Sequence, residues 1–67
     1  MRIIVIMPTY NERENIGEMI DVLMGSEFPK IKNHEMHLLV VDDYSPDGTG
    51  EIVKGETKKY KNLHLLS

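Results

Sequence analysis

The sequence lacks cysteine entirely, so no disulfide and no cysteine-containing zinc site can hold the fold together. Its histidines, His34, His37 and His64, are scattered along the chain, and we interpret them as surface or packing residues. A chain of 67 residues buries only about 60% of its unfolded surface, so we expect a small core and marginal stability. The absence of cysteine also fits a reducing compartment, and we expect a cytoplasmic protein.

Positive charge and long apolar stretches are scarce as well. Eight Lys and Arg against eleven Asp and Glu give a formal net charge of -3, which disfavours a general nucleic-acid-binding surface. The single basic cluster, Lys58, Lys59 and Lys61, lies near the end of an expected helix, where it complements the helix dipole. The apolar opening at 1–7 is too short for a signal peptide or a transmembrane segment. We therefore expect a soluble chain.

Several catalytic and nucleotide-binding motifs are also missing. No Gly-x-Gly-x-x-Gly follows the first apolar run, and Gly-Lys-Ser/Thr does not occur. A dinucleotide-binding loop and a phosphate-binding loop of these types are therefore disfavoured. No Ser-His-Asp or Cys-His set can be assembled for nucleophilic catalysis. The chemistry of this chain must rest on other polar residues.

Three short apolar runs, rich in β-branched residues or leucine, predict buried strands at 3–7, 36–41 and 63–66. The stretches between them predict helices at 12–24 and 49–60. With right-handed crossovers, this alternation predicts an α/β fold with a three-stranded parallel sheet, most simply in spatial order 3-2-1. We expect a Rossmann-like βαβαβ unit in three layers, with helices on the faces of the sheet.

The first helix has boundary signals of its own. Asn11 and Glu14 have the spacing of a capping box, which predicts the start of the helix. Gly25 predicts its end, and a surface loop follows over 26–35.

The second helix is the weaker one. Either Asp47 or Thr49 can be its cap. Gly50 and Gly55 each cost about 1 kcal/mol relative to Ala. Glu56 falls where a core-facing residue is expected.

Polar residues follow the first two predicted strands. The segments 8–12 and 42–48 lie at their carboxyl ends, which meet at one edge of a parallel sheet, where ligands bind in open α/β folds. Asp42 and Asp43 are adjacent. Two like charges at the end of a buried strand repel each other, which suggests that these residues have a functional role. The alternative is a solvated loop whose Asp and Ser side chains only cap the next helix. We expect both segments to face one crevice.

The residues of this crevice suit a nucleotide. The aromatic face of Tyr10 can stack on a base. A carboxylate such as Glu12, Asp42 or Asp43 can accept one ring N–H from uracil or two N–H groups on the same edge of guanine. Another carboxylate can accept from ribose hydroxyls. Base and sugar binding is therefore chemically sensible, with Tyr10 as a simple packing residue the alternative.

Three segments carry a resemblance to a known family. The segments 8–12 (Pro-Thr-Tyr-Asn-Glu), 40–43 (Val-Val-Asp-Asp) and 45–49 (Ser-Pro-Asp-Gly-Thr) strongly resemble the start of an inverting family 2 glycosyltransferase of GT-A fold. Within that family they look most like dolichyl-phosphate, or polyprenyl-phosphate, mannosyltransferases. The resemblance covers nearly the whole chain but only about the first third of a family catalytic domain. We therefore expect an N-terminal, nucleotide-binding fragment.

The resemblance implies nucleotide-sugar-dependent transfer, with mannose passing from GDP-mannose to a polyprenyl (dolichyl) phosphate. It implies that Asp43 hydrogen-bonds the base and that Asp42 shapes the loop. The residues it places at the nucleotide are Pro8, Tyr10, Glu12, Val41 and Asp43. Pro8, Tyr10 and Glu12 would line the base and ribose, and Val41 would present its backbone. Tyr44 stands where such sequences often have Asn or Gly, so the loop can sit differently.

The resemblance also implies groups that this chain lacks. The Mg2+ or Mn2+ of the full-length enzyme is held by an Asp-x-Asp motif that does not occur here. We therefore expect no metal ligand and no catalytic residue in the chain, which alone should be inactive, although its full-length parent is an enzyme at the cytoplasmic face of a membrane. Without further strands beside it, the first strand should support self-association.

Two other interpretations remain open. One is a stand-alone, non-catalytic nucleotide-binding or interaction module. The other is a receiver of the response-regulator type, suggested by the acidic pair after a strand. The third strand, at 63–66, ends without the phosphoacceptor Asp or the later Lys that a receiver needs.

Overall fold

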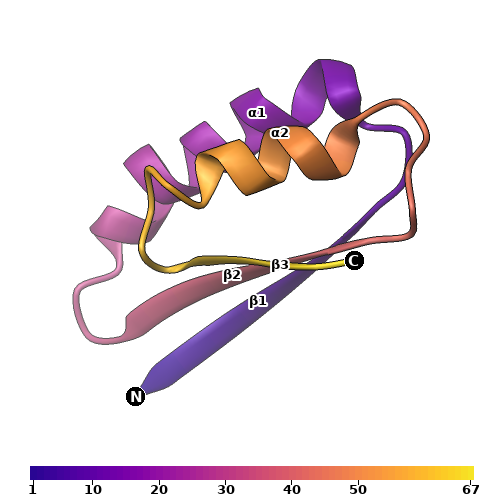
Figure 1. Cartoon of the computed structure of the whole chain (residues 1–67). Coiled ribbons are helices and arrows are strands. Elements are labelled where there is room, and N and C mark those ends of the chain that lie inside the picture. Colours follow the sequence, from indigo (N-terminus) through magenta and orange to yellow (C-terminus); the bar gives the residue numbers. More distant parts are fainter.

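The computed structural model describes all 67 residues as a parallel sheet with two connecting helices (Figure 1). The strands are β1 (Arg2–Thr9), β2 (Glu35–Asp42) and β3 (Leu63–Leu66), and they lie in the order β1-β2-β3. Helix α1 (Arg13–Val22) joins β1 to β2, and α2 (Thr49–Glu56) joins β2 to β3. The predicted α/β class, parallel pairing and strand order are confirmed.

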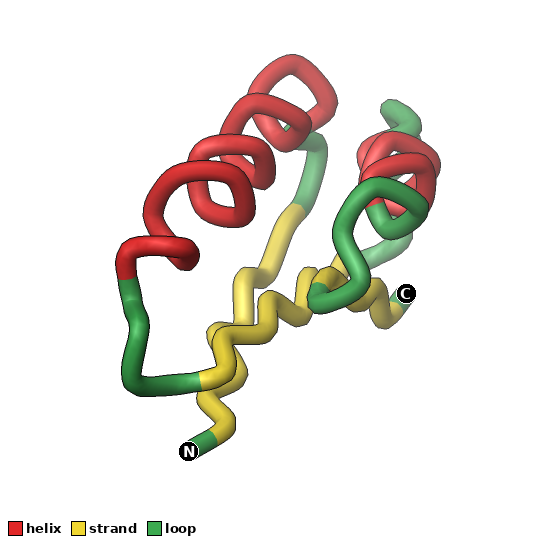
Figure 2. Tube along the Cα trace, turned by 90° about the vertical axis from the view of Figure 1, so that its left-hand side faces the viewer, coloured by secondary structure: helices red, strands yellow, loops and turns green.

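Both helices lie on the same face of the sheet (Figure 2). Two successive right-handed crossovers that step in the same direction along the sheet carry their helices to the same side. The chain therefore forms two layers, and these residues do not form the third layer that was expected. Neither helix has the length and apolar character needed to cross a membrane.

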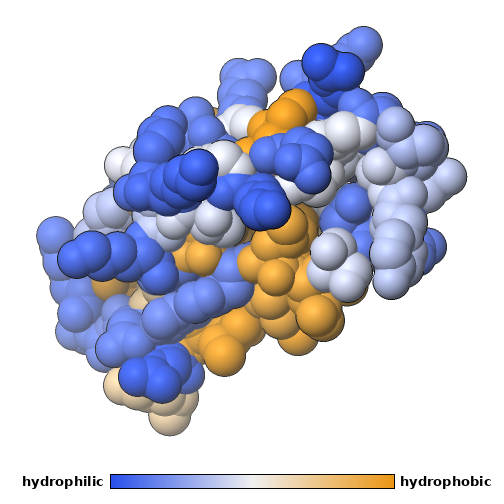
Figure 3. Space-filling view, viewed as in Figure 1, coloured by the Kyte–Doolittle hydropathy of each residue, from blue (hydrophilic) through white to orange (hydrophobic).

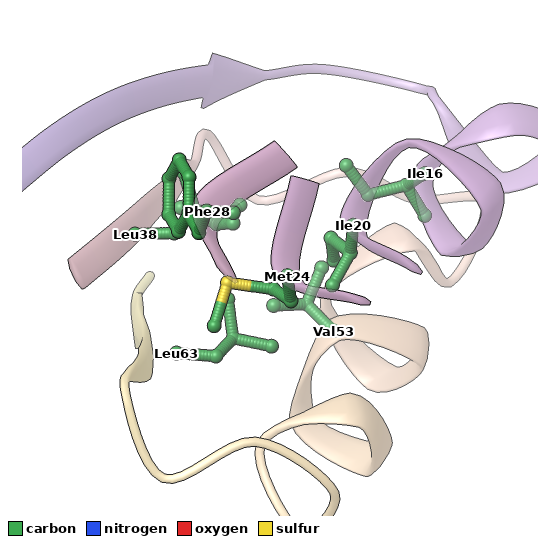
Figure 4. Packing of buried hydrophobic residues seen from close by; sticks show 8 residues of the cluster. Ile16, Ile20, Met24, Phe28, Leu38, Val53 and Leu63 are labelled. Carbon is green, nitrogen blue, oxygen red and sulfur yellow. The ribbon is translucent and has the colours of Figure 1, made fainter. Parts of the chain in front are cut away.

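The core lies between the sheet and the helices. Alternate residues of β2, Leu38 and Val40, point toward the helices and are fully buried. Figure 4 shows Met24 and Val53 meeting near Leu63, with Phe28 beside Leu38. The complete cluster consists of Ile16, Ile20, Met24, Phe28, Leu38, Val40, Val53 and Leu63.

The opposite face of the sheet is bare. Ile4 and Ile6 pair with His37 and Leu39, which alternate with the buried residues of β2 and so point away from the helices. Ile4 and Ile6 are accordingly exposed, as is Leu66 on β3. In Figure 3, hydrophobic surface is exposed to solvent below the polar surface of the helices.

The chain beyond α1 differs from the prediction. Gly25 does not end the helical path, which continues through a π-helical turn at Leu23–Glu27 and a 3-10 turn at Phe28–Lys30. Met24 and Phe28 are both buried, so this continuation brings two large side chains into the core. That burial outweighs the cost of about 1 kcal/mol for one helical glycine. The expected loop at 26–35 is therefore helical over its first five residues.

Other boundaries move for local reasons. β1 runs through Pro8 to Thr9, because an edge strand tolerates a residue without an N–H group. The capping box at the start of α1 is absent, since Asn11 has a left-handed backbone with φ of 54°. Helix α2 ends at Glu56, four residues before the predicted end at 60.

Candidate functional site

The loops that follow β1 and β2 are joined at the carboxyl edge of the sheet, as the right-hand end of Figure 1 shows. The backbone N–H of Asp43 donates to the carbonyl of Thr9 at 3.2 Å. The N–H of Asn11 donates to Ser45 Oγ at 2.9 Å. The predicted meeting of the two segments at one edge is therefore confirmed.

Asp42 ends β2 with a buried carboxylate, only 5% exposed. Its oxygens accept hydrogen bonds from Thr9 Oγ1 at 3.0 Å, from the N–H of Ser45 at 3.1 Å and from Ser45 Oγ at 2.5 Å. Burial raises the pKa of Asp42, but the hydrogen bonds from Ser45 and Thr9 outweigh it and hold the pKa below its usual value. These contacts fit the loop-shaping role expected of Asp42.

Gly50 in the first turn of α2 leaves space for this carboxylate. A Cβ atom at Gly50 would lie 3.3 Å from Asp42 Oδ2. The glycine that costs helix propensity in the sequence therefore has a packing reason in the fold.

The half-buried Asp47, two residues before the start of α2, is a second acceptor of several hydrogen bonds at this edge. It accepts from the N–H of Thr49 at 3.0 Å, from Thr49 Oγ1 at 2.5 Å and from the N–H of Arg13 at 3.1 Å. The hydrogen bond from the Thr49 hydroxyl is the main reason that the pKa of Asp47 lies below its usual value. Gly48 has φ of 91°, a left-handed turn that favours glycine. The N-cap of α2 is Gly48, so the prediction of Asp47 or Thr49 at this position is wrong, although the Asp47 side chain does accept the N–H of Thr49.

The start of α1 takes its caps from the other loop. Glu12 occupies the cap position but makes no side-chain cap hydrogen bond. Instead its N–H donates to Thr49 Oγ1 at 3.0 Å, and the N–H of Arg13 donates to Asp47. Sequence reasoning placed Thr9 and Ser45 at this edge and Thr49 at the start of the second helix, but it missed the hydrogen bonds that their hydroxyls make between the two loops. The Ser-Pro-Asp-Gly-Thr motif was visible, but its partners lie more than thirty residues away.

The predicted nucleotide residues divide into two groups. Pro8 and Val41 pair in the register of β1 and β2 and face the bare side of the sheet. The backbone N–H of Asp43 bonds the carbonyl of Thr9, the neighbour of Tyr10. Tyr10 is 55% exposed, and the carboxylate of Asp43 is exposed and makes no hydrogen bond within the chain. These four residues therefore share one edge.

Glu12 is placed differently. Its residue is half-buried and lines a shallow depression of about 550 Å³ along the outer side of α1. The other residues that line this depression are Asn15, Glu18, Met19, Val22 and Leu23. Glu12 is thus next to Tyr10 in the chain but borders a mostly helical surface.

A second depression, of about 250 Å³, opens between the carboxyl ends of β2 and β3. Its lining residues are Asp42, Tyr44, Ser45, Gly48, Gly50, Glu51, Lys54, Leu65 and Ser67. Tyr44 is 81% exposed and has a left-handed backbone with φ of 50°. Lys54 supplies the one cation of this depression, and no pattern in the sequence singled it out.

The residues present do not fit a divalent cation. No group of three or more His, Cys, Asp or Glu side chains is close enough to hold one. The carboxylates of Asp42 and Asp47 already accept hydrogen bonds from hydroxyl and N–H groups.

Comparison with known proteins identifies relatives of the chain. The profile of the family described as Glycosyl transferase family 2 matches residues 4–67. Glycosyltransferase AglE of Haloferax volcanii is 42% identical over 62 residues, which are 92% of this chain and 19% of that protein. Polyprenol monophosphomannose synthase of Mycolicibacterium smegmatis is 49% identical over 51 residues, 76% of this chain and 17% of that protein.

A third relative has another sugar in its name. Poly(ribitol-phosphate) beta-glucosyltransferase of Bacillus spizizenii is 33% identical over 66 residues, 98% of this chain and 10% of that protein. The chain thus spans between 10% and 19% of the length of these three relatives. No solved structure gives a significant match.

Proposed function

Because the chain belongs to glycosyl transferase family 2, we propose that its carboxyl edge binds the nucleotide of a sugar donor. One observation carries this proposal. Of the three aspartates at this edge, Asp42 and Asp47 each accept three hydrogen bonds within the chain. The exposed carboxylate of Asp43 accepts none, and the Asp43 backbone is bonded to Thr9, the residue before the exposed Tyr10. A free acceptor next to an aromatic face suits a planar base that carries N–H donors.

Each predicted residue has a role in this arrangement. Tyr10 stacks on the base, and Asp43 accepts its ring N–H groups. Val41 presents backbone beside the base, while Pro8 and Glu12 line the base and ribose. Asp42 holds the loop and does not touch the nucleotide.

We propose GDP-mannose as the donor and a polyprenyl phosphate as the acceptor in a longer protein. The relative named as a polyprenol monophosphomannose synthase supports this choice, although the relative named as a glucosyltransferase shows that family membership leaves the sugar open. Guanine offers two N–H groups on one edge and can engage both oxygens of Asp43. Mg2+ or Mn2+ would be held by residues other than these, and a lipid acceptor favours the cytoplasmic face of a membrane.

Titration calorimetry with GDP and UDP tests the nucleotide site in the absence of metal. We expect GDP to bind more tightly than UDP. We also expect Asp43→Ala to lose about 1.5–3 kcal/mol of binding free energy, the usual value for a hydrogen bond to a charged group. Glu27→Ala is the matched control, because Glu27 is an exposed carboxylate in the turn beyond the far end of α1. Asp42→Ala would be a poor control, since it removes the support of the loop.

Two outcomes would contradict the proposal. Equal affinity of the Asp43→Ala and Glu27→Ala variants would show that Asp43 is not part of the site, and preference for UDP would exclude GDP-mannose as the donor. The alternative function, a non-catalytic nucleotide-binding module, predicts binding without transfer. We expect no sugar transfer by the chain alone, with or without Mg2+ or Mn2+, and turnover above a protein-free control would be the contrary result.

We further propose that the chain associates with a second copy through β1. This eight-residue strand is at the edge of the sheet, and Val5 and Ile6 on it are exposed. Its unpaired N–H and C=O groups are free to pair with another strand. Only Pro8, which lacks an N–H group, and the charged Arg2, which bonds Glu35, hinder such pairing. Sedimentation equilibrium over a concentration series should show a dimer or larger assembly. A folded monomer at high concentration would overturn this proposal.

A further inference from the structure

Two hydroxyl groups connect the aspartates of the second loop to the backbone of the first. Thr49 Oγ1 donates to Asp47 Oδ1 at 2.5 Å and accepts the N–H of Glu12 at 3.0 Å. Ser45 Oγ donates to Asp42 Oδ1 at 2.5 Å and accepts the N–H of Asn11 at 2.9 Å. Each aspartate therefore acts on the β1–α1 loop through one bridging hydroxyl.

The direction of each bridge is determined by its carboxylate. An ionised carboxylate can only accept, so the hydroxyl proton points toward it and the hydroxyl lone pairs are left for the backbone N–H. Thr49 is fully buried, so water does not compete for its hydroxyl. The low pKa values of Asp42 and Asp47 mean that both acids stay ionised at neutral pH.

The bridged loop needs such support. Asn11 has φ of 54° and Tyr44 has φ of 50°, and both left-handed conformations cost a non-glycine residue energy. The two strained residues lie one in each loop, next to Tyr10 and Asp43. Without the bridges, the backbone of Tyr10 and Asn11 would relax toward other conformations.

The hydroxyl of Thr49 is also not needed by its own helix. Thr49 is the first residue of α2, and its backbone N–H already bonds Asp47. Its side chain instead serves α1, which has no cap of its own. The hydroxyl is thus placed for the neighbouring loop.

We propose that Thr49 and Ser45 are positioning residues of the nucleotide site, which hold Tyr10 and Glu12 in place through the backbone of the β1–α1 loop. This inference rests on the proposed function. Neither residue is required to touch the nucleotide through its hydroxyl, because both hydroxyls are already engaged.

The test compares Thr49→Val with Thr49→Ser, since valine keeps the shape and loses the hydroxyl, whereas serine keeps the hydroxyl. We expect Thr49→Val to weaken GDP binding about tenfold, the equivalent of one hydrogen bond. Thr49→Ser, which keeps the hydroxyl, should bind GDP as the wild type does. Thr57→Val is the control, because the Thr57 hydroxyl bonds the carbonyl of Lys54 at the far end of α2. Ser45→Ala should weaken GDP binding as well, and it carries the test if Thr49→Val does not fold.

Amide hydrogen exchange of the nucleotide-free chain supplies a second readout. A positioning role predicts faster exchange at Asn11 or Glu12 with little change in the core amides of β2, whereas a merely structural role would speed exchange throughout. Unchanged GDP binding in both Thr49→Val and Ser45→Ala would overturn this inference alone. A wild-type chain that binds no GDP would overturn the proposed function and this inference together.

Discussion

Two pairs of acidic residues lie at opposite ends of the helical layer, and they differ in how well their carboxylates are hydrogen-bonded. At the carboxyl edge, both oxygens of Asp42 and both oxygens of Asp47 accept hydrogen bonds. The pKa values of both acids are lowered. At the other end, Asp21 of α1 meets Glu56, the last residue of α2.

The second pair is only partly satisfied. Asp21 Oδ1 accepts from the Tyr60 hydroxyl at 2.8 Å and from Lys59 Nζ at 3.1 Å, and the hydrogen bond from Tyr60 is the main cause of its lowered pKa. Glu56 Oε2 is buried and has no hydrogen-bond partner. Burial, together with the nearby carboxyl of Asp21, raises the pKa of Glu56.

The difference shows that the number of available hydrogen-bond donors decides whether the pKa of an acid is lowered or raised. The loops at the carboxyl edge have backbone N–H groups that no helix or strand uses, and these groups face Asp42 and Asp47. Glu56 lies beside helices whose N–H groups already bond within the helix, so only side chains are available to it. Variants at the two ends of the helical layer should differ in stability according to this contrast.

Asp42→Ala should produce the largest loss. It leaves the Thr9 hydroxyl and the Ser45 N–H without their acceptor in a buried site, which should lower the free energy of unfolding by about 2–3 kcal/mol. Urea denaturation measures the loss. The neighbouring Asp43→Ala variant is the control and should change stability by less than about 0.5 kcal/mol, because its side chain is exposed. Equal losses in the two variants would show that the buried network is not stabilising.

Glu56→Met should have the opposite sign. It removes a buried oxygen that lacks a partner, and we expect the free energy of unfolding to rise by about 1 kcal/mol. Glu51→Met removes the same charge from an exposed position of α2 and serves as the control. A less stable Glu56→Met variant would mean that the carboxyl is better satisfied than its contacts indicate.

The two acidic pairs should also respond differently to pH. Asp42 and Asp47 have pKa values below the ordinary 3.8, so their stabilisation is present above that pH and is lost as pH falls through the lowered values. Glu56 has a pKa above the ordinary 4.5, so its contribution is present below 4.5 and is lost as pH rises through the raised value. The stability gained by Glu56→Gln should therefore increase as pH rises above 4.5. Urea titrations at several pH values should show this, and a difference independent of pH would contradict it.

Tyr60→Phe should have the smallest effect on stability, because the bond that it removes is at an exposed carboxylate. Its consequence should appear in the titration of Asp21, whose pKa should rise toward the ordinary value of 3.8. Carboxyl chemical shifts followed by NMR measure this change. Tyr10→Phe is the control, since the Tyr10 hydroxyl bonds nothing in the chain, and an unmoved Asp21 in the Tyr60→Phe variant would exclude the hydroxyl as the cause.

Much of the fold follows from local patterns in the sequence. The apolar runs marked the three strands, and their alternation with helices determined the parallel order β1-β2-β3. The same order with right-handed crossovers also implies that both helices share one face, a consequence that the expectation of three layers overlooked. The segments that follow β1 and β2 met at one edge as predicted, while the contacts of Tyr10 and Asp43 with a nucleotide stay a prediction.

The sequence by itself determined which segments are strands and helices, because periodicity and β-branched residues act over a few neighbouring positions. The tertiary structure decided where helices begin and continue. Burial of Phe28 is the reason that the helical path continues past Gly25. Asp47 and Thr49 accept the N–H groups at the start of α1, in place of the expected capping box at Asn11. A hydrogen bond across 37 residues depends on how the sheet brings two loops together, and no local pattern records that distance.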